Sequence, residues 1–188
     1  RGLGDVYKRQ RILLLERTAM KNSVTIKEMT RAEGNHMIRT NEIVTLYHGS
    51  KSGIRGKIAP ISRERCDFGK GFYMGTDRTQ PLTLICNYPD ARIYTLSADL
   101  SDLRILDIEV GLDWALLVAY NRGKMDSIKG SAIYDLFFNG EITDMALVNN
   151  LSALKLGRQY VALTEKACKK IRILDEQKLT EDDRNDVV

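Results

Sequence analysis

The sequence has few of the residues that build metal centres and disulfide frameworks. It holds three cysteines and two histidines among 188 residues. The cysteines (Cys66, Cys86 and Cys168) are odd in number and share no metal-ligand spacing, which argues against a zinc site. We therefore expect reduced thiols, no bound metal and a cytoplasmic protein.

Long apolar runs are also missing. The longest uncharged apolar stretch, residues 114–120, is far shorter than the ~20 residues that cross a bilayer. The run at 12–15 ends at Glu16 and is too short for the core of a signal peptide. We therefore expect no membrane-spanning segment.

Most of the chain has no excess of positive charge. The net charge is +4, but residues 1–36 hold eight of the 29 basic residues and only four of the 25 acidic ones. The other 152 residues are formally neutral. The core therefore offers no basic surplus that would favour nucleic-acid binding.

The first residues differ from the rest of the chain. Residues 5–10, Asp-Val-Tyr-Lys-Arg-Gln, resemble the translation of a transposon end used as a sequencing adaptor. Residues 11–36 show no clean helical or alternating period. We expect residues 1–36 to be a non-native or disordered leader, residues 37–176 to form the domain and residues 177–188 to be an acidic tail.

Short strands at both ends of this domain, with helices between them, predict an α+β fold. Alternating, β-branched and aromatic segments predict strands over 43–47, 71–74, 92–98, 104–108, 159–163 and 171–174. Helical patterns predict helices over 78–87, 112–121, 131–138 and 142–154, and a short helix capped by Thr164. Asp77 is the expected N-cap of the first helix. A strand after helix 112–121 has one weak candidate, residues 125–128.

Two short motifs carry candidate chemistry: His48-Gly49-Ser50 at a strand end, and the glycine-rich segment 68–73 that ends in Tyr73. A histidine followed by glycine offers a side-chain donor and an open backbone N–H and C=O, which a planar carboxamide can bond together. A tyrosine on a neighbouring strand supplies a π-face for a flat ring, and glycines let a ligand approach closely. These are the parts of a pocket for an amide-bearing aromatic ring such as nicotinamide.

The order of these motifs resembles the catalytic domain of the poly(ADP-ribose) polymerases. Residues 46–50, 58–60 and 68–73 match that family's HGS, IAP and FGKG-aromatic-Tyr motifs at comparable spacing. With a late strand followed by Thr-Glu-Lys-Ala, the chain is also similar to an uncharacterised bacterial family placed among ADP-ribosyltransferase-like folds. The resemblance implies split antiparallel sheets with flanking helices, and NAD as the substrate.

The resemblance also implies roles for single residues. His48 would bond the adenosine-ribose hydroxyl, Tyr73 would stack on the nicotinamide ring, and Gln159 stands where the polymerases have a catalytic glutamate. The catalytic set is thus His48, Tyr73 and Gln159. The NAD-binding set is His48, Gly49, Ser50, Gly71, Tyr73 and Leu84, the leucine standing where a second aromatic closes the family's nicotinamide sandwich.

The chemistry explains what a glutamine changes. The bond from nicotinamide to ribose breaks with oxocarbenium-like charge on the sugar, which a carboxylate stabilises. Gln159 can hold the ribose 2′-hydroxyl but brings no charge. Glu165 is the nearby carboxylate, and it is better explained as a first-turn helix acid. We therefore expect transfer of single ADP-ribose groups and no polymer synthesis.

Three functions stay open at this point. The leading hypothesis is a mono-ADP-ribosyltransferase that modifies an unknown macromolecule, in keeping with a bacterial toxin or defence effector. The alternatives are an inactive module that binds NAD or ADP-ribose, which Leu84 and Gln159 favour, and an NAD glycohydrolase. The sequence leaves open whether a cognate inhibitor protein is a partner.

Overall fold

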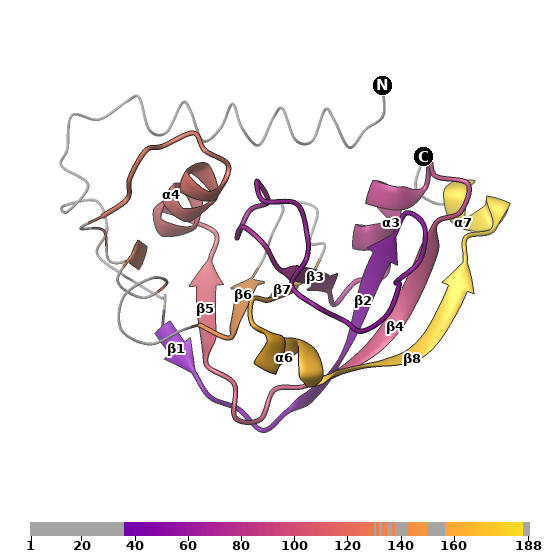
Figure 1. Cartoon of the computed structure of the whole chain (residues 1–188), viewed down its shortest axis with the longest axis horizontal. Coiled ribbons are helices and arrows are strands. Elements are labelled where there is room, and N and C mark those ends of the chain that lie inside the picture. The colour runs from indigo at the N-terminus through magenta and orange to yellow at the C-terminus, as the bar shows by residue number, and fades with distance from the viewer. Residues whose placement is uncertain are drawn as a thin grey trace.

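The computed structural model describes residues 36–129, 131, 133, 134, 137, 143–149 and 157–185. Over these residues it is an α+β fold built on one large sheet, as predicted (Figure 1). The strands are β1 His36–Ile38, β2 Ile43–Ser50, β3 Phe72–Gly75, β4 Arg92–Asp99, β5 Ile105–Glu109, β6 Met145–Asn149, β7 Gln159–Ala162 and β8 Ile171–Lys178. The helices are α3 Thr79–Ile85, α4 Leu112–Asn121, α6 Glu165–Lys169 and α7 Glu181–Asn185.

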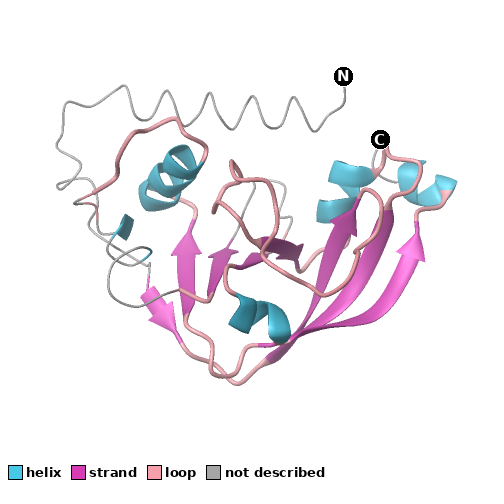
Figure 2. Cartoon of the chain, in the orientation of Figure 1, coloured by secondary structure: helices cyan, strands magenta, loops and turns pink. Residues whose placement is uncertain are grey.

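The sheet is almost divided between β2 and β3. Its strand order is β1-β5-β6-β7-β3-β2-β4-β8, and β2 pairs with β3 through a single residue pair, Tyr47 with Gly75. By contrast, all eight residues of β2 pair with β4. Figure 2 shows β2, β4 and β8 as a group of strands inclined relative to the upright β5 and β6. The split that the resemblance implies is thus present as a narrow junction within one sheet, and every pair among the described strands is antiparallel except β5 with β6.

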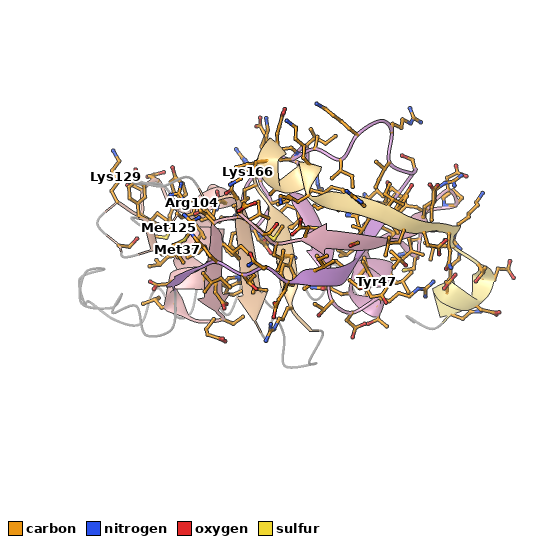
Figure 3. All side chains as sticks on the ribbon, turned by 90° about the horizontal axis from the view of Figure 1, so that it is seen from below. Met37, Tyr47, Arg104, Met125, Lys129 and Lys166 are labelled. Carbon is orange, nitrogen blue, oxygen red and sulfur yellow. The ribbon has the colours of Figure 1, made fainter. Side chains whose placement is uncertain are left out.

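Helices cover the two halves of the sheet separately. Leu82 and Ile85 of α3 form an apolar cluster with Ile93 of β4, and Tyr47 of β2 packs against it. Figure 3 shows Tyr47 beside this helix. In the other half, α4 buries Trp114, Leu117 and Val118 against β5 and β6. The short helix α6 contributes Ala167 and Cys168 to a third cluster, which includes Leu46 and Tyr94.

The prediction of a helix over 142–154 is wrong where the structure describes it. Residues 145–149 form β6, which lies parallel to β5. Met145 to Val148 are all buried, so this short apolar run is sequestered on both faces of the sheet. The strand expected after α4 is therefore β6 and not residues 125–128. Much of the predicted helix over 131–138 lies outside the described residues.

The acidic end of the chain contributes to the fold. Strand β8 continues to Lys178, beyond the predicted 171–174, and α7 follows it. In α7, Asp183 pairs with Arg78 at 2.9 Å, and Arg184 donates to the backbone carbonyl of Cys86 at the end of α3. The predicted tail thus ties α7 to both ends of α3. No helix among the described residues is long and apolar enough to cross a membrane.

Candidate functional site

The junction of β2 and β3 leaves backbone groups without a strand partner. The N–H of Thr76 donates to Arg158 O beside β7 (3.0 Å), so Tyr73 and Gly75 turn their backbone groups toward β2. Because Gly75 pairs with Tyr47, the alternation of β2 turns the N–H and C=O of Gly49 toward the same gap. The paired residues stop at Tyr47 and Gly75, so no ladder continues from Gly49 to Tyr73.

The side chain of His48 bonds a backbone group of β3 where the strand pairing has ended. Its Nδ1 lies 2.7 Å from the Tyr73 carbonyl oxygen, and its ring stacks on Phe72 with centroids 4.2 Å apart. A carbonyl can only accept, so Nδ1 carries the proton. Burial lowers the pKa of His48 below its usual 6.5, although the bond to Tyr73 opposes this shift. At neutral pH the ring is therefore uncharged, and Nε2 is an acceptor suited to a ligand hydroxyl.

Gly49 lies at a close approach of α3 to β2. A Cβ on this residue would fall 2.9 Å from Ile85 Cδ1 and 3.1 Å from both Cβ and O of Pro81. These distances are shorter than ordinary van der Waals contacts, so a side chain would push the helix away. The packing of α3 thus requires glycine at 49, while its backbone groups remain directed toward the gap.

The ring of Tyr73 is fixed by its hydroxyl group. The hydroxyl donates to Gly69 O (2.8 Å) and accepts from the Phe68 N–H (2.9 Å). Burial raises the pKa of Tyr73 well above its usual value, although the Phe68 bond opposes the shift. The phenol therefore stays neutral and acts as an anchor, and the half-buried ring is the part left to contact a flat ligand.

The glycine-rich turn before β3 supplies this anchor. Gly69 has φ of +70°, a conformation that favours glycine, and Gly71 N–H donates to Ser62 Oγ (3.0 Å). A Cβ on Gly71 would lie 2.6 Å from Val161 Cγ1 on β7. An ion pair between Asp67 in this turn and Arg122 at the end of α4 connects the turn to that helix. The glycines therefore serve the turn and the β3–β7 contact, and the turn positions Tyr73.

Gln159 begins β7 on the same face of the sheet as Tyr73. It pairs with Gly75, and Val161 pairs with Tyr73, so the side chains of 73, 159 and 161 share one face. Thr76 Oγ1 accepts from the Arg158 N–H (2.8 Å), which fixes the start of the strand. The side-chain Oε1 of Gln159 is buried and has no hydrogen-bond partner among the described residues. Such an acceptor is rare in native structures and calls for an explanation.

The structure gives less support for a place in the site to the remaining predicted residues. Ser50 ends β2 opposite Arg92. Leu84 lies on the outer surface of α3 with 57% of its surface exposed, so no described residue encloses it. Glu165 is exposed in the first turn of α6, the position that its interpretation as a helix acid predicts.

Sequence reasoning missed Gln80 on α3. Its Oε1 is also buried without a hydrogen-bond partner among the described residues, and its carboxamide fills the space where Gly75 lacks a side chain. No sequence signal distinguishes this glutamine, because only the approach of α3 to β3 brings it to the site. Within the part of the chain that the structure describes, no group of three or more His, Cys, Asp or Glu side chains could hold a metal ion.

The comparisons agree with this architecture. A chain in the crystal structure of the M. tuberculosis MbcT–MbcA toxin–antitoxin complex is similar in fold, with a TM-score of 0.51 at 13% sequence identity. The match covers 86% of this chain and 96% of that one. None of the curated proteins matches the sequence. Residues 44–173 match the family described as protein of unknown function DUF3990, so the chain belongs to the DUF3990 family.

Proposed function

We propose that this protein binds NAD and transfers single ADP-ribose groups to a macromolecule. One observation carries the proposal: at the gap between β2 and β3, His48 bonds the Tyr73 carbonyl through Nδ1, which leaves Nε2 as an acceptor, and the backbone of Gly49 faces the same gap. The ring of Tyr73 is half-buried on the neighbouring strand. Gln159, with its unpartnered oxygen, lies on the face that Tyr73 shares. These four groups match the carboxamide, ring and hydroxyls of the nicotinamide half of NAD.

Each group has a defined task in the reaction. The nicotinamide carboxamide bonds the N–H and C=O of Gly49, and its ring lies on Tyr73. His48 Nε2 and Gln159 Oε1 accept hydrogen bonds from ribose hydroxyls. The bond from the ribose to the nicotinamide nitrogen breaks, and its electron pair leaves with nicotinamide. A nucleophile on the acceptor then bonds the ribose carbon and loses its proton. The site contributes positioning, because Gln159 brings no charge to the developing cation.

A toxin-like role is part of the proposal. The structural neighbour comes from a toxin–antitoxin complex, and this likeness of fold supports an effector whose activity a partner protein restrains. A cognate inhibitor protein is therefore a proposed partner. The acceptor macromolecule is proposed only as a class, since the residues around the gap carry no signature of its chemistry.

A second function is favoured by two specific observations. Leu84 is exposed where the related enzymes enclose nicotinamide, and Gln159 is uncharged where they carry a glutamate. Both features fit a module that holds NAD or ADP-ribose without breaking it.

NAD labelled on its adenylate half separates these functions when it is incubated with the protein and a bacterial lysate. Label on macromolecules supports the transferase, and free ADP-ribose with nicotinamide indicates a hydrolase. Binding without turnover indicates the module. His48→Ala is expected to abolish each of these signals, whereas Arg172→Ala, an exposed change on β8, is expected to leave them intact. The family resemblance would be overturned by wild-type protein that neither binds nor consumes NAD.

A further inference from the structure

Two glutamines whose carboxamide oxygens are buried adjoin Gly75. Gln80 comes from the first turn of α3 and Gln159 from the first position of β7. A Cβ on Gly75 would fall within the Gln80 carboxamide, 3.0 Å from its Cδ. Gly75 is also the register partner of Gln159, and directly paired Cβ positions lie about 4.5–5.5 Å apart. The carboxamide of Gln80 therefore reaches the face of the sheet from which Gln159 projects.

Neither oxygen has a hydrogen-bond partner among the described residues. A buried acceptor without a donor destabilises the folded protein, and native structures avoid it unless water, a ligand or a functional need explains it. Two such acceptors beside one glycine could both be satisfied by a group that carries two neighbouring donors. A vicinal diol has this chemistry, and each ribose of NAD carries one.

We propose that Gln80 is a second substrate-positioning residue, which works beside Gln159 to hold the two hydroxyls of the nicotinamide ribose. The inference rests on the proposed function and extends it to a residue of α3. Two amide oxygens accept hydroxyl protons without adding charge, so they orient the ribose but do not stabilise a cation as a carboxylate does. The two acceptors thereby select a ligand with a ribose diol, and NAD turnover at this site is slow because no charge stabilises the cation.

Gln80→Met tests the proposal in the full-length protein, because methionine keeps the length of the side chain and the helix propensity but removes the acceptor. NAD binding measured by calorimetry is expected to weaken about 3- to 10-fold. The urea midpoint of the NAD-free protein is expected to stay the same or rise, because an unsatisfied buried group is lost. Gln177→Met is the matched control, since Gln177 is exposed and its Oε1 already accepts from Arg78 at 3.3 Å.

NAD analogues that lack the 2′- or the 3′-hydroxyl of the nicotinamide ribose complete the test. If Gln80 holds one of these hydroxyls, the effect of Gln80→Met disappears with the analogue that lacks it. Equal binding of NAD by wild type and variant would overturn the inference, and so would a parallel loss of affinity and stability. Wild-type protein that binds NAD while Gln80→Met changes nothing leaves the proposed function standing without this residue. Wild-type protein that does not bind NAD removes both.

Discussion

Gly49, Gly71 and Gly75 each lack a side chain where a neighbouring element comes close. The nearest atoms belong to Ile85 on α3 for the first, to Val161 on β7 for the second and to the Gln80 carboxamide for the third. A glycine-rich motif is often interpreted as room for a ligand. Gly49 and Gly71 are required by packing, because backbone atoms also limit the space beside them, whereas the end of the Gln80 side chain can move away from Gly75. The glycines therefore support ligand binding only together with the backbone direction at Gly49 and the anchored ring of Tyr73.

We expect His48 to make the free energy of unfolding depend on pH between about pH 5 and 6.5. Burial lowers its pKa, so below pH 6.5 the folded protein binds fewer protons than the unfolded chain, and stability falls as the pH falls. Carboxylates act in a lower window: hydrogen bonds from Ser101 lower the pKa of Asp99 from 3.8 to about 2, so its contribution is lost only below about pH 4. His48→Asn keeps a donor near the position of Nδ1 but does not titrate.

Urea unfolding at pH 7.5, 6.5 and 5 checks this expectation. The wild-type free energy of unfolding is expected to decrease between pH 6.5 and 5, and His48→Asn is expected to show a shallower decrease. An equal slope in both proteins would assign the effect to other groups.

At the scale of elements, the position of α3 decides whether the site exists, because this helix covers Gly49 and carries Gln80. Gly49→Ala is expected to destabilise the protein by about 1–3 kcal/mol, since the new methyl group meets Ile85 Cδ1 and Pro81. Adding Ile85→Val removes Cδ1 and is expected to restore part of the loss. Chemical denaturation of the two single variants and the double variant measures the coupling. If the changes in the free energy of unfolding of the two single variants simply add in the double variant, the side chain of Ile85 does not restrict the space at Gly49.

Sequence patterns located most elements and the two motifs of the candidate site. They failed where a strand is buried on both faces, because such a strand lacks the alternation of apolar and polar residues. Met145 to Val148 is apolar at every position, and such a run does not distinguish a buried strand from a helix. The proposed role of Gln80 could not be predicted from the sequence either, because it depends on where α3 rests against β3. The ligand roles of His48, Tyr73 and Gln159 came from the resemblance to known enzymes and remain predictions. The structure adds that His48 bonds the Tyr73 carbonyl and that Gln159 shares a face of the sheet with Tyr73.

At the scale of the whole molecule, two half-sheets meet through one residue pair and one histidine ring. Leu46 is two positions from His48 and turns its amide toward β4, whereas the amide of Gly49 turns toward the gap. Hydrogen exchange followed by NMR is therefore expected to be slow at Leu46 and fast at Gly49 in the free protein.

Saturating NAD is expected to slow exchange at the Gly49 amide at least about 10-fold and to leave Leu46 unchanged. Slow exchange at Gly49 before NAD is added would mean that β2 and β3 continue their ladder in solution. That result would remove the backbone groups on which the carboxamide contact depends.

The one parallel pair among the described strands, β5 with β6, has a consequence for the order of folding. Residues 110–144 separate β5 from β6, and a parallel pair closes only after such a long connection has been arranged, which makes it a slow, non-local step. Helix α4 lies in this connection, and Arg122 just beyond it holds Asp67 in the turn before β3. Refolding chains are therefore expected to fix the turn before β3, and with it Tyr73, only after this connection is in place, so that ligand recognition is among the last properties a newly folded molecule acquires.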